Sequence, residues 1–454
     1  MSNPRIYGRG QKRRKRMAAA KKVAEERYEH KMIRKLRAKI LRGGKIEKRK
    51  ERRYKIRGVR RLEEIAKYRQ KEPKKYEVQI PEILSFIDAP RETMDFLDEL
   101  KRKLNKKVLY NLSIIHEKCR RIDLAASYIF DKIVKDERKY WKSRRIELRV
   151  AGRISHVSKK VNNFLLSFGL LSDFGLINAR FTEEEIDYDY RDKYETYRYQ
   201  GSSKRVYDNS QASMGLVEYF NSCFKHNHLQ IKEEARLELV NKFGEIIGNA
   251  EEHAGNDGGG WVALGCYDKE ERECSFAIVN FGRSIYESLS NANSTAADVI
   301  ENIADVINSN KRIWEKTVGM FDKNQEEPLW NVMALQDGIS SKRTISGKGS
   351  TRGKGIMDVL TFIDAVKSED GAKVGIVSGH SSITMDYTYP IVQKEIGVNK
   401  EKRRIISFNK EKDLKMPPDK EKVFAIKKKF EGTVFGGRFK INEKYLTIKM
   451  EKNK

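Results

Sequence analysis

Residues 245–253 read EIIGNAEEH, and they belong to a longer stretch, 231–254, in which apolar residues recur at helical spacing. Such a repeat predicts one helix whose apolar face packs against a sheet. Asn241, Glu245 and Asn249 recur at intervals of four, so their side chains lie along one strip of that helix. A polar strip beside a buried helical face indicates a ligand, although Glu and Asn are also common on helix surfaces.

Two strands joined by a charged turn follow this helix. Three glycines, 258–260, lead into the apolar run WVALGCY (261–267), which DKEERE separates from CSFAIVN (274–280). A charged turn between two apolar runs predicts a pair of strands. The next residues, VNFGRSI (279–285), contain a glycine and open a short helix.

A glycine-rich loop opens the next helix. Residues 346–363, SGKGSTRGKGIMDVLTFI, place four glycines within nine residues before an apolar helical run. Glycines permit the backbone angles and the close approach that are needed to wrap phosphates, and a helix N-terminus adds backbone donors. The loop is not a Walker loop, because Gly355 stands where that motif has Ser or Thr. A flexible basic loop is the alternative interpretation.

The order of these segments, with FEGTVFGGRF (430–439) as a closing strand, resembles the GHKL nucleotide-binding domain of gyrase-like ATPases and sensor histidine kinases. The resemblance implies a GHKL (Bergerat) α/β sandwich with a mixed sheet that binds ATP and Mg²⁺. In this family an Asn of the first helix holds the magnesium ion, and a Glu one turn earlier activates water. By that resemblance Asn249 is the magnesium ligand and Glu245 the general base. Magnesium prefers oxygen ligands, and a carboxylate near the terminal phosphate can orient water.

The short glycine loop resembles the family's Asp-x-Gly-x-Gly-Ile motif, whose Asp accepts a hydrogen bond from the adenine amino group. Gly282 and Ile285 match the motif, whereas Asn280 replaces the Asp and Ser284 replaces the second glycine. Asn280 still offers a carbonyl acceptor, although an uncharged acceptor forms a weaker hydrogen bond than a carboxylate. Weak or slow use of the nucleotide is therefore an open alternative. The closing strand places Thr433 near the adenine edge by the same resemblance.

The glycine-rich loop resembles the phosphate lid of the family, with two glycines at tight turns and basic side chains available to the phosphates. The expected nucleotide-binding residues are Asn249, Asn280, Gly282, Ile285, Gly347, Lys348, Gly349, Arg352, Gly353, Lys354, Gly355 and Thr433, with Glu245 as the catalytic residue. For the insertion before the lid, residues 291–345, we expect only a mobile cover of the site.

The segment before this domain alternates between helices and strands. Helices are expected at 93–104 and 124–133 and strands at 107–113 and 145–150, which indicates a small α/β domain with a parallel sheet. The runs VLYNLS and IDLAASYIF resemble the strand and helix of STAS domains, the fold of anti-sigma-factor antagonists. Asp123 is followed by Leu and two alanines, not by an acceptor Ser or Thr, so the resemblance implies a scaffold without a phosphoacceptor.

Charge is distributed unevenly along the 454 residues, whose net charge is +29. Residues 1–75 hold 31 Lys and Arg against 8 Asp and Glu, and their composition predicts a helical arm. Such a basic stretch, 9–61, predicts salt-dependent binding of a polyanion, and nucleic acid is the expected one. A solvated surface segment is the alternative, because the arm lacks interleaved aromatic residues.

Residues 181–229 are polar and rich in tyrosine, and we expect a connection or an exposed flap. The candidates for stacking on bases, or for covering a domain junction, are Tyr188, Tyr190, Tyr194, Tyr197 and Tyr199. The predicted organisation is a basic helical arm at 1–75, a STAS-like α/β domain at 76–180, the connection at 181–229, the GHKL domain at 230–440 and a basic tail at 441–454.

No stretch approaches eighteen consecutive apolar residues and the N-terminus lacks a secretory apolar segment, so we expect a cytoplasmic protein without a membrane partner. The four cysteines are expected to be free thiols. Cys223, His226 and His228 lie close together in the sequence, but a polar turn is favoured over a metal site because a fourth ligand is missing.

These observations favour an ATP-driven conformational switch that hydrolyses ATP slowly and acts on nucleic acid or on a protein partner through its basic arm. Two alternatives stay open, an anti-sigma-type serine/threonine kinase and a nucleic-acid-binding protein with a degenerate nucleotide site. The sequence is also compatible with a homodimer.

Overall fold

The computed structural model describes residues 76–106, 111–143, 148–169, 181–201, 208–254, 260–290, 297–318, 325–339, 354–396 and 401–441. These residues form a protein of the mixed α/β class. The predicted arm at 1–75, residues 442–454 of the predicted tail and most of the predicted lid lie outside the described stretches. Within those stretches, no helix is both long enough and apolar enough to cross a membrane.

Contacts divide the chain into two units. The first comprises Met1–Val78, Leu100–Ile114 and Glu137–Gly152, and the second comprises Gln79–Glu99, Ile115–Asp136 and Arg153–Lys454. The expected nucleotide-binding residues all belong to the second unit. The boundaries of the STAS-like and GHKL domains stay predictions.

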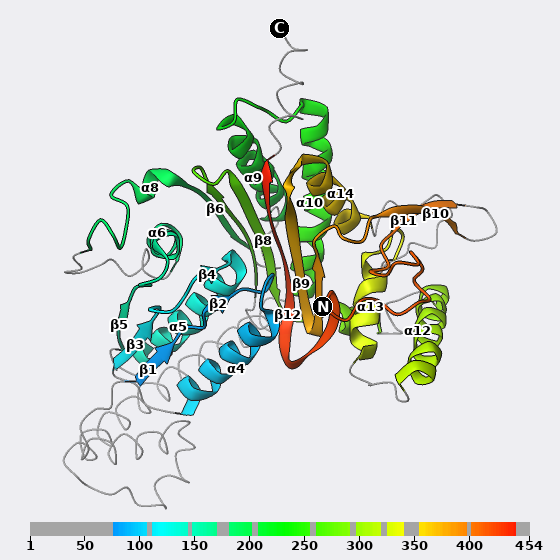
Figure 1. The fold of residues 1–454 in the computed structure, drawn as a ribbon, viewed down its shortest axis with the longest axis horizontal. Helices are drawn as coiled ribbons and strands as arrows, with labels where there is room; N and C mark the ends of the chain where they lie inside the picture. Colours follow the sequence, from blue (N-terminus) through cyan, green and yellow to red (C-terminus); the bar gives the residue numbers. More distant parts are fainter. Residues whose placement is uncertain are drawn as a thin grey trace, which may run out of the picture. The chain divides into compact units, whose positions relative to one another are not determined.

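The second unit is built on a five-stranded sheet (Figure 1). In spatial order the strands are β6 (Tyr194–Gly201), β7 (Trp261–Asp268), β8 (Glu273–Phe281), β12 (Val423–Ile441) and β9 (Lys367–Met385). Neighbouring strands are antiparallel throughout, which corrects the expectation of a mixed sheet. For β7 and β8 the reason is the short charged turn, because a parallel pair needs a much longer crossover.

The runs AKVGIVSG (372–379) and SSITMDYT (381–388) predict two separate strands after the lid, but the structure joins them in the single strand β9. Gly379 lies between them with φ +59, a left-handed conformation that glycine adopts without strain. The register of β9 against β12 shifts on both sides of the Phe430–Gly379 pair. A local irregularity was therefore mistaken for a break between strands.

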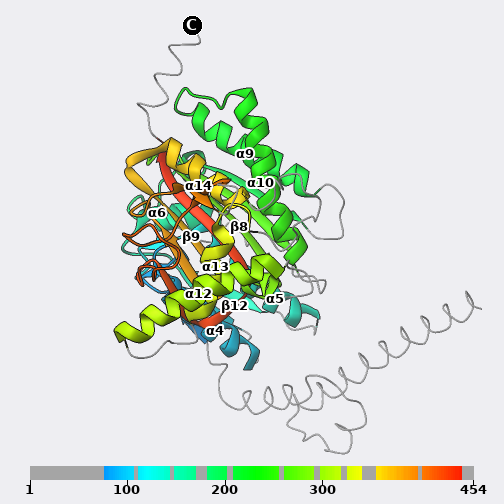
Figure 2. The same cartoon turned by 90° about the vertical axis from the view of Figure 1, so that its right-hand side faces the viewer.

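Three helices cover one face of this sheet: α9 (Asp208–Lys225), α10 (Glu233–His253) and α14 (Gly355–Val366) (Figure 2). Successive side chains of a strand point to opposite faces, so alternate residues meet the helices. Ile278 of β8, Phe435 of β12 and Ile376 of β9 join Phe243 and Ile247 of α10 in one buried core. The helix expected at the start of the GHKL region is thus confirmed as a helix packed on a sheet.

The strand β6 corrects the expectation of a tyrosine-rich connection. Its eight residues pair with β7 along their whole length. Tyr197 packs against the core and donates its hydroxyl to the Ala212 carbonyl of α9 at 2.9 Å. Tyr199 stacks on Trp261 with ring centroids 6.0 Å apart. Both rings belong to the sheet edge and not to an exposed flap.

The insertion before the lid also has a different structure from the expected mobile cover. Its described parts contain α12 (Ala297–Val318) and α13 (Glu326–Leu335), which follow the short helix α11 (Ile285–Leu289). Ile303 of α12 and Trp330 of α13 belong to a second buried core. The cover therefore has apolar packing of its own. A small antiparallel pair, β10 (Val392–Ile396) and β11 (Glu401–Ile405), follows β9.

The two helices and two strands expected between residues 93 and 150 occur in the expected order, as α4 (Pro90–Lys106), β3 (Asn111–Ile115), α5 (Leu124–Ser143) and β5 (Arg149–Arg153). The structure adds the short strands β1 (Tyr76–Gln79), β2 (Ile83–Leu84) and β4 (Arg121–Ile122) and the helices α6 (Lys159–Ser167) and α8 (Tyr190–Lys193). The first sheet has the order β1-β3-β5, and β2 pairs with β4 in parallel. Most predicted ends differ by several residues from the observed ones, as is usual for element boundaries.

Candidate functional site

Three polar side chains lie in one row across three neighbouring strands. Asn280 of β8 is opposite Thr433 of β12, and Thr433 is opposite Ser378 of β9. Each stands two positions from a core residue of its own strand, so all three project from the face that the helices cover. The structure thus brings together Asn280 and Thr433, both of which were predicted to lie at the adenine edge.

Ser378 connects this row to the glycine loop. It is fully buried, and its Oγ accepts a hydrogen bond from the Ile285 backbone N–H at 2.8 Å. The same oxygen lies 3.1 Å from the Gly432 carbonyl and 2.8 Å from Thr433 Oγ1. Thr433 itself is only half-buried.

Two buried donors in this region have no hydrogen-bond partner within the described part of the chain. Asn280 is 3% exposed, and its side-chain nitrogen Nδ2 has no acceptor. The neighbouring Trp261 of β7, which lies opposite Asn280, is 1% exposed, and its indole nitrogen Nε1 has none either. A buried donor without a partner costs about 1–3 kcal/mol. An acceptor supplied by a ligand would remove this cost at Asn280.

The polar strip of α10 meets the first residue of α14. Glu245 is half-buried, and Asn249, one turn later, is exposed. A Cβ atom added at Gly355 would lie 3.1 Å from the Glu245 Cβ and equally close to its carboxylate oxygen Oε2. Only a glycine fits this approach without displacing the glutamate. The two predicted site residues Glu245 and Gly355 are therefore neighbours.

The glycine loop binds to the protein through its own backbone. The Gly282 N–H donates to the Glu431 carbonyl at 3.1 Å, and the Ile285 N–H donates to Ser378. Ser284 forms a capping box at the start of α11, because its hydroxyl accepts from the Glu287 N–H and the Glu287 carboxylate accepts from the Ser284 N–H. Gly282 and Ile285 thus hold the loop in place, and their N–H groups are not free for a base.

Of the predicted lid, Lys354 and Gly355 are described. Lys354 is exposed at the N-cap of α14 and makes no side-chain cap. The predicted residues that lie outside the described stretches are Gly347, Lys348, Gly349, Arg352 and Gly353. Their expected contacts with phosphate stay a prediction.

Ser378 and Trp261 were not among the predicted site residues. The run AKVGIVSG carries a signal for Ser378, because its alternation places Ser378 on the same face as the core residues Val374 and Ile376. Trp261 packs against Gly201 of β6, where an added Cβ would lie 2.2 Å from the indole. That contact between β6 and β7 could not be anticipated while β6 was interpreted as a connection.

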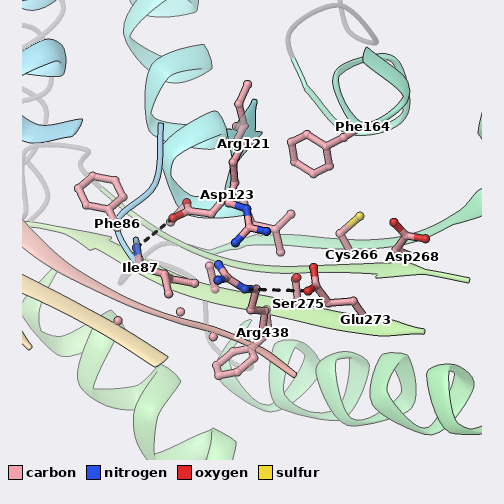
Figure 3. Close-up of a pocket in the computed structure, with 18 of the residues that line it drawn as sticks. Phe86, Ile87, Arg121, Asp123, Phe164, Cys266, Asp268, Glu273, Ser275 and Arg438 are labelled. Carbon is pink, nitrogen blue, oxygen red and sulfur yellow. Dashed lines mark hydrogen bonds and ion pairs between the residues drawn. The ribbon is translucent and has the colours of Figure 1, made fainter. Parts of the chain in front are cut away.

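A cavity of about 140 Å³ lies against the opposite face of the sheet (Figure 3). The strand residues in its wall include Ser275, Ala277 and Gly436, which alternate with the core residues. Figure 3 shows the Arg438 and Asp123 side chains at this cavity, with Asp123 directed toward the Ile87 N–H. The cavity is thus separated from the row of Asn280 by the thickness of the sheet.

Several charged side chains that line this cavity form ion pairs. Asp88 accepts two hydrogen bonds from Arg438, at 2.6 and 2.9 Å. Burial alone would raise the pKa of Asp88, but the hydrogen bond and positive charge of Arg438 outweigh it and hold that pKa well below its usual range. Burial raises the pKa of Asp123, although backbone N–H groups donate to it. The charge of Asp88 is thus compensated within the protein, whereas burial disfavours the charged form of Asp123.

No cluster of three or more His, Cys, Asp or Glu side chains suited to a metal ion is found in the residues that the structure describes. His226 pairs with Glu195 at 2.6 Å. The cysteines are free and buried. A protein-family scan, a search of curated proteins and a search of solved structures each found no match to this chain.

Proposed function

We propose that the chain binds ATP with Mg²⁺ in a site of the GHKL type between α10, α14 and the end of the five-stranded sheet, and hydrolyses it slowly. One observation carries the proposal: Asn280, a buried side chain with an unpartnered donor, stands in register with Thr433 on the helix-covered face. A core position occupied by an unsatisfied amide is costly unless a ligand completes its hydrogen bonds.

The chemistry of this row fits adenine. A carboxamide offers one acceptor and a pair of donors side by side, and an Asn side chain can pair with the amino group and a ring nitrogen of adenine. The Thr433 hydroxyl lies next to Asn280 across the two strands. The replacement of the family's Asp by Asn280 therefore keeps an acceptor and adds a donor.

The chemistry of the polar strip fits a triphosphate with magnesium. The carbonyl oxygen of Asn249 is a hard ligand of the kind magnesium prefers, and a bound ion would neutralise phosphate charge there. Glu245 lies beside the N-terminus of α14, whose free backbone N–H groups and dipole favour an anion. In this proposal Glu245 takes the proton of the attacking water.

The binding half of the proposal is tested by calorimetry with Mg²⁺ and ATP on the full chain. Asn249→Ala is expected to weaken binding by tenfold or more, about 1.4 kcal/mol, because the proposed ligand of the ion is lost. Asn241→Ala is the matched control, since Asn241 is an exposed Asn on the same strip two turns earlier. Equal affinities of the two variants, or no ATP binding by the wild type, would refute the proposed site.

The catalytic half is tested by the release of free phosphate. Glu245→Gln keeps the size of the side chain but not its basicity, so hydrolysis is expected to fall by about 10²-fold or more, while ATP still binds. Glu238→Gln, at an exposed residue of α10 that pairs with Lys242, serves as the control. Transfer of phosphate to a protein instead of to water would favour the kinase alternative.

For the partner of such a switch, the proposal names two classes, nucleic acid and protein. The basic arm and most of the lid lie outside the described residues, so binding of nucleic acid through 9–61 and closure of the lid rest on the sequence. The resemblance of the N-terminal segment to a STAS scaffold also rests on the sequence. Salt-dependent RNA or DNA binding by the full chain, with and without ATP, would connect the arm to the nucleotide site.

A further inference from the structure

We propose that Ser378 is a positioning residue that makes the base site select a 6-amino purine over a 6-oxo purine, by fixing the Thr433 hydroxyl as a hydrogen-bond acceptor. The inference rests on the proposed nucleotide site and adds the origin of its base specificity. Ser378 does not touch the base in this proposal and acts through Thr433.

The hydrogen-bond inventory of Ser378 sets the direction of each bond. A serine hydroxyl has one hydrogen and two lone pairs. One lone pair accepts from the Ile285 N–H, which can only donate. If the hydrogen goes to the Gly432 carbonyl, which can only accept, the second lone pair is left for Thr433. Thr433 must then donate its own hydrogen to Ser378.

The opposite direction satisfies fewer groups. If Ser378 donated to Thr433, the buried Gly432 carbonyl would lose the hydrogen of Ser378, and one lone pair of the fully buried Ser378 would stay unused. Unmade hydrogen bonds of buried groups cost free energy, so the first arrangement is favoured. In it, Thr433 has no hydrogen left for a ligand and presents only lone pairs.

Asn280 alone cannot distinguish a 6-amino purine from a 6-oxo purine. Its amide can rotate by 180° and exchange the positions of its donor and acceptor, so it can face an amino group or a carbonyl. No hydrogen bond from within the described residues fixes its Nδ2. The neighbouring Thr433 therefore decides whether this row presents a fixed acceptor to the base.

The fixed acceptor at Thr433 distinguishes the two purine classes. Adenine carries an amino donor at position 6, whereas guanine and hypoxanthine carry a carbonyl acceptor there. An amino group can donate to Thr433, but a carbonyl would meet a second acceptor and remain unsatisfied. Sites that hydrogen-bond a ligand group reject analogues that leave buried polar groups unpaired.

The test compares the binding of ATP and of inosine triphosphate, whose bases differ in the group at position 6 and, with it, in the proton that hypoxanthine carries on the adjacent ring nitrogen N1. The wild type is expected to bind ATP about tenfold more tightly or better, as one good hydrogen-bond pairing provides. Ser378→Ala frees the Thr433 hydroxyl to rotate, so the ratio of the two affinities is expected to fall toward one. Ser381→Ala is the matched control, because Ser381 is a fully buried serine of β9 whose hydroxyl has no partner within the described residues.

A purely structural role of Ser378 would lower the affinity for both nucleotides equally and leave the ratio unchanged, which would overturn the inference. If Ser378→Ala does not fold, Thr433→Val gives the second measurement, because it removes the hydroxyl at nearly constant shape. It is expected to abolish the preference for ATP, and a retained preference would overturn the inference. Failure of the proposed function is distinguishable, since the wild type would then bind neither nucleotide.

Discussion

Ser284 has a structural role at a position where the GHKL motif that this loop resembles has glycine. Glycine would suit a close approach of the backbone to a base. Here Ser284 is fully buried and caps α11, and its capping box with Glu287 satisfies two N–H groups that a helix start leaves free. Glu287 also pairs with Lys429 of β12 at 2.7 Å, so the cap ties the loop to the sheet.

Replacement of Ser284 by alanine is expected to lower the free energy of unfolding by about 1 kcal/mol, the usual contribution of an N-cap side chain. Denaturant unfolding measures the change. Ser309→Ala is the control, because Ser309 is a half-buried serine in the middle of α12 whose hydroxyl donates to the Asp305 carbonyl one turn earlier and caps no helix. A loss no larger than that of the control would show that the capping box contributes nothing to stability.

At the scale of elements, the sequence predicted the helices better than the sheet. The apolar repeat of α10 and the paired runs of β7 and β8 are local patterns, so they were predicted with the right type and nearly the right ends. β6 pairs with β7 at the sheet edge and alternates half-buried tyrosines with exposed polar residues. Its composition resembles a loop, and only the pairing with a distant segment makes it a strand.

The contact between β6 and β7 gives a prediction about stability. A Cβ at Gly201 would lie 2.2 Å from the buried indole of Trp261, so Gly201→Ala is expected to cost about 1–3 kcal/mol through overpacking. Gly244→Ala should act in the opposite direction, because a Cβ at this helical position of α10 meets nothing closer than 3.7 Å. Alanine is favoured over glycine there by about 0.5–1 kcal/mol. An unfolding midpoint of Gly201→Ala that is no lower than that of the wild type would contradict the contact between β6 and Trp261.

At the scale of the whole molecule, the candidate site is assembled from segments that are far apart in the chain. Asn280, Thr433 and Ser378 come from three strands, and Glu245 meets Gly355 from two helices. The resemblance predicted Asn280, Thr433, Glu245 and Gly355, because each belongs to a motif. It could not predict Ser378, whose role arises from strand register and from the hydrogen bonds of its neighbours.

Stability of the second unit as a whole is expected to depend on pH through His116. This residue is 4% exposed, its Nδ1 lies 3.2 Å from the Arg153 carbonyl, and burial lowers its pKa from 6.5 to about 4. Between these two values the unfolded chain binds a proton that the folded state excludes. The contribution of His116 is therefore fully present above pH 6.5, and it is lost as the pH falls to about 4.

The shift corresponds to a loss of about 3 kcal/mol across this window, at about 1.4 kcal/mol for each pKa unit. Denaturant unfolding at pH 7 and pH 4 should therefore show a smaller difference in His116→Gln than in the wild type. The comparison between the two proteins cancels the carboxylates that titrate nearby, such as Asp123, whose raised pKa acts in the opposite sense. His156→Gln, at an exposed position, is the control and should keep the wild-type difference. The same difference in all three proteins would mean that His116 is protonated at pH 4 in the folded state as well as in the unfolded chain.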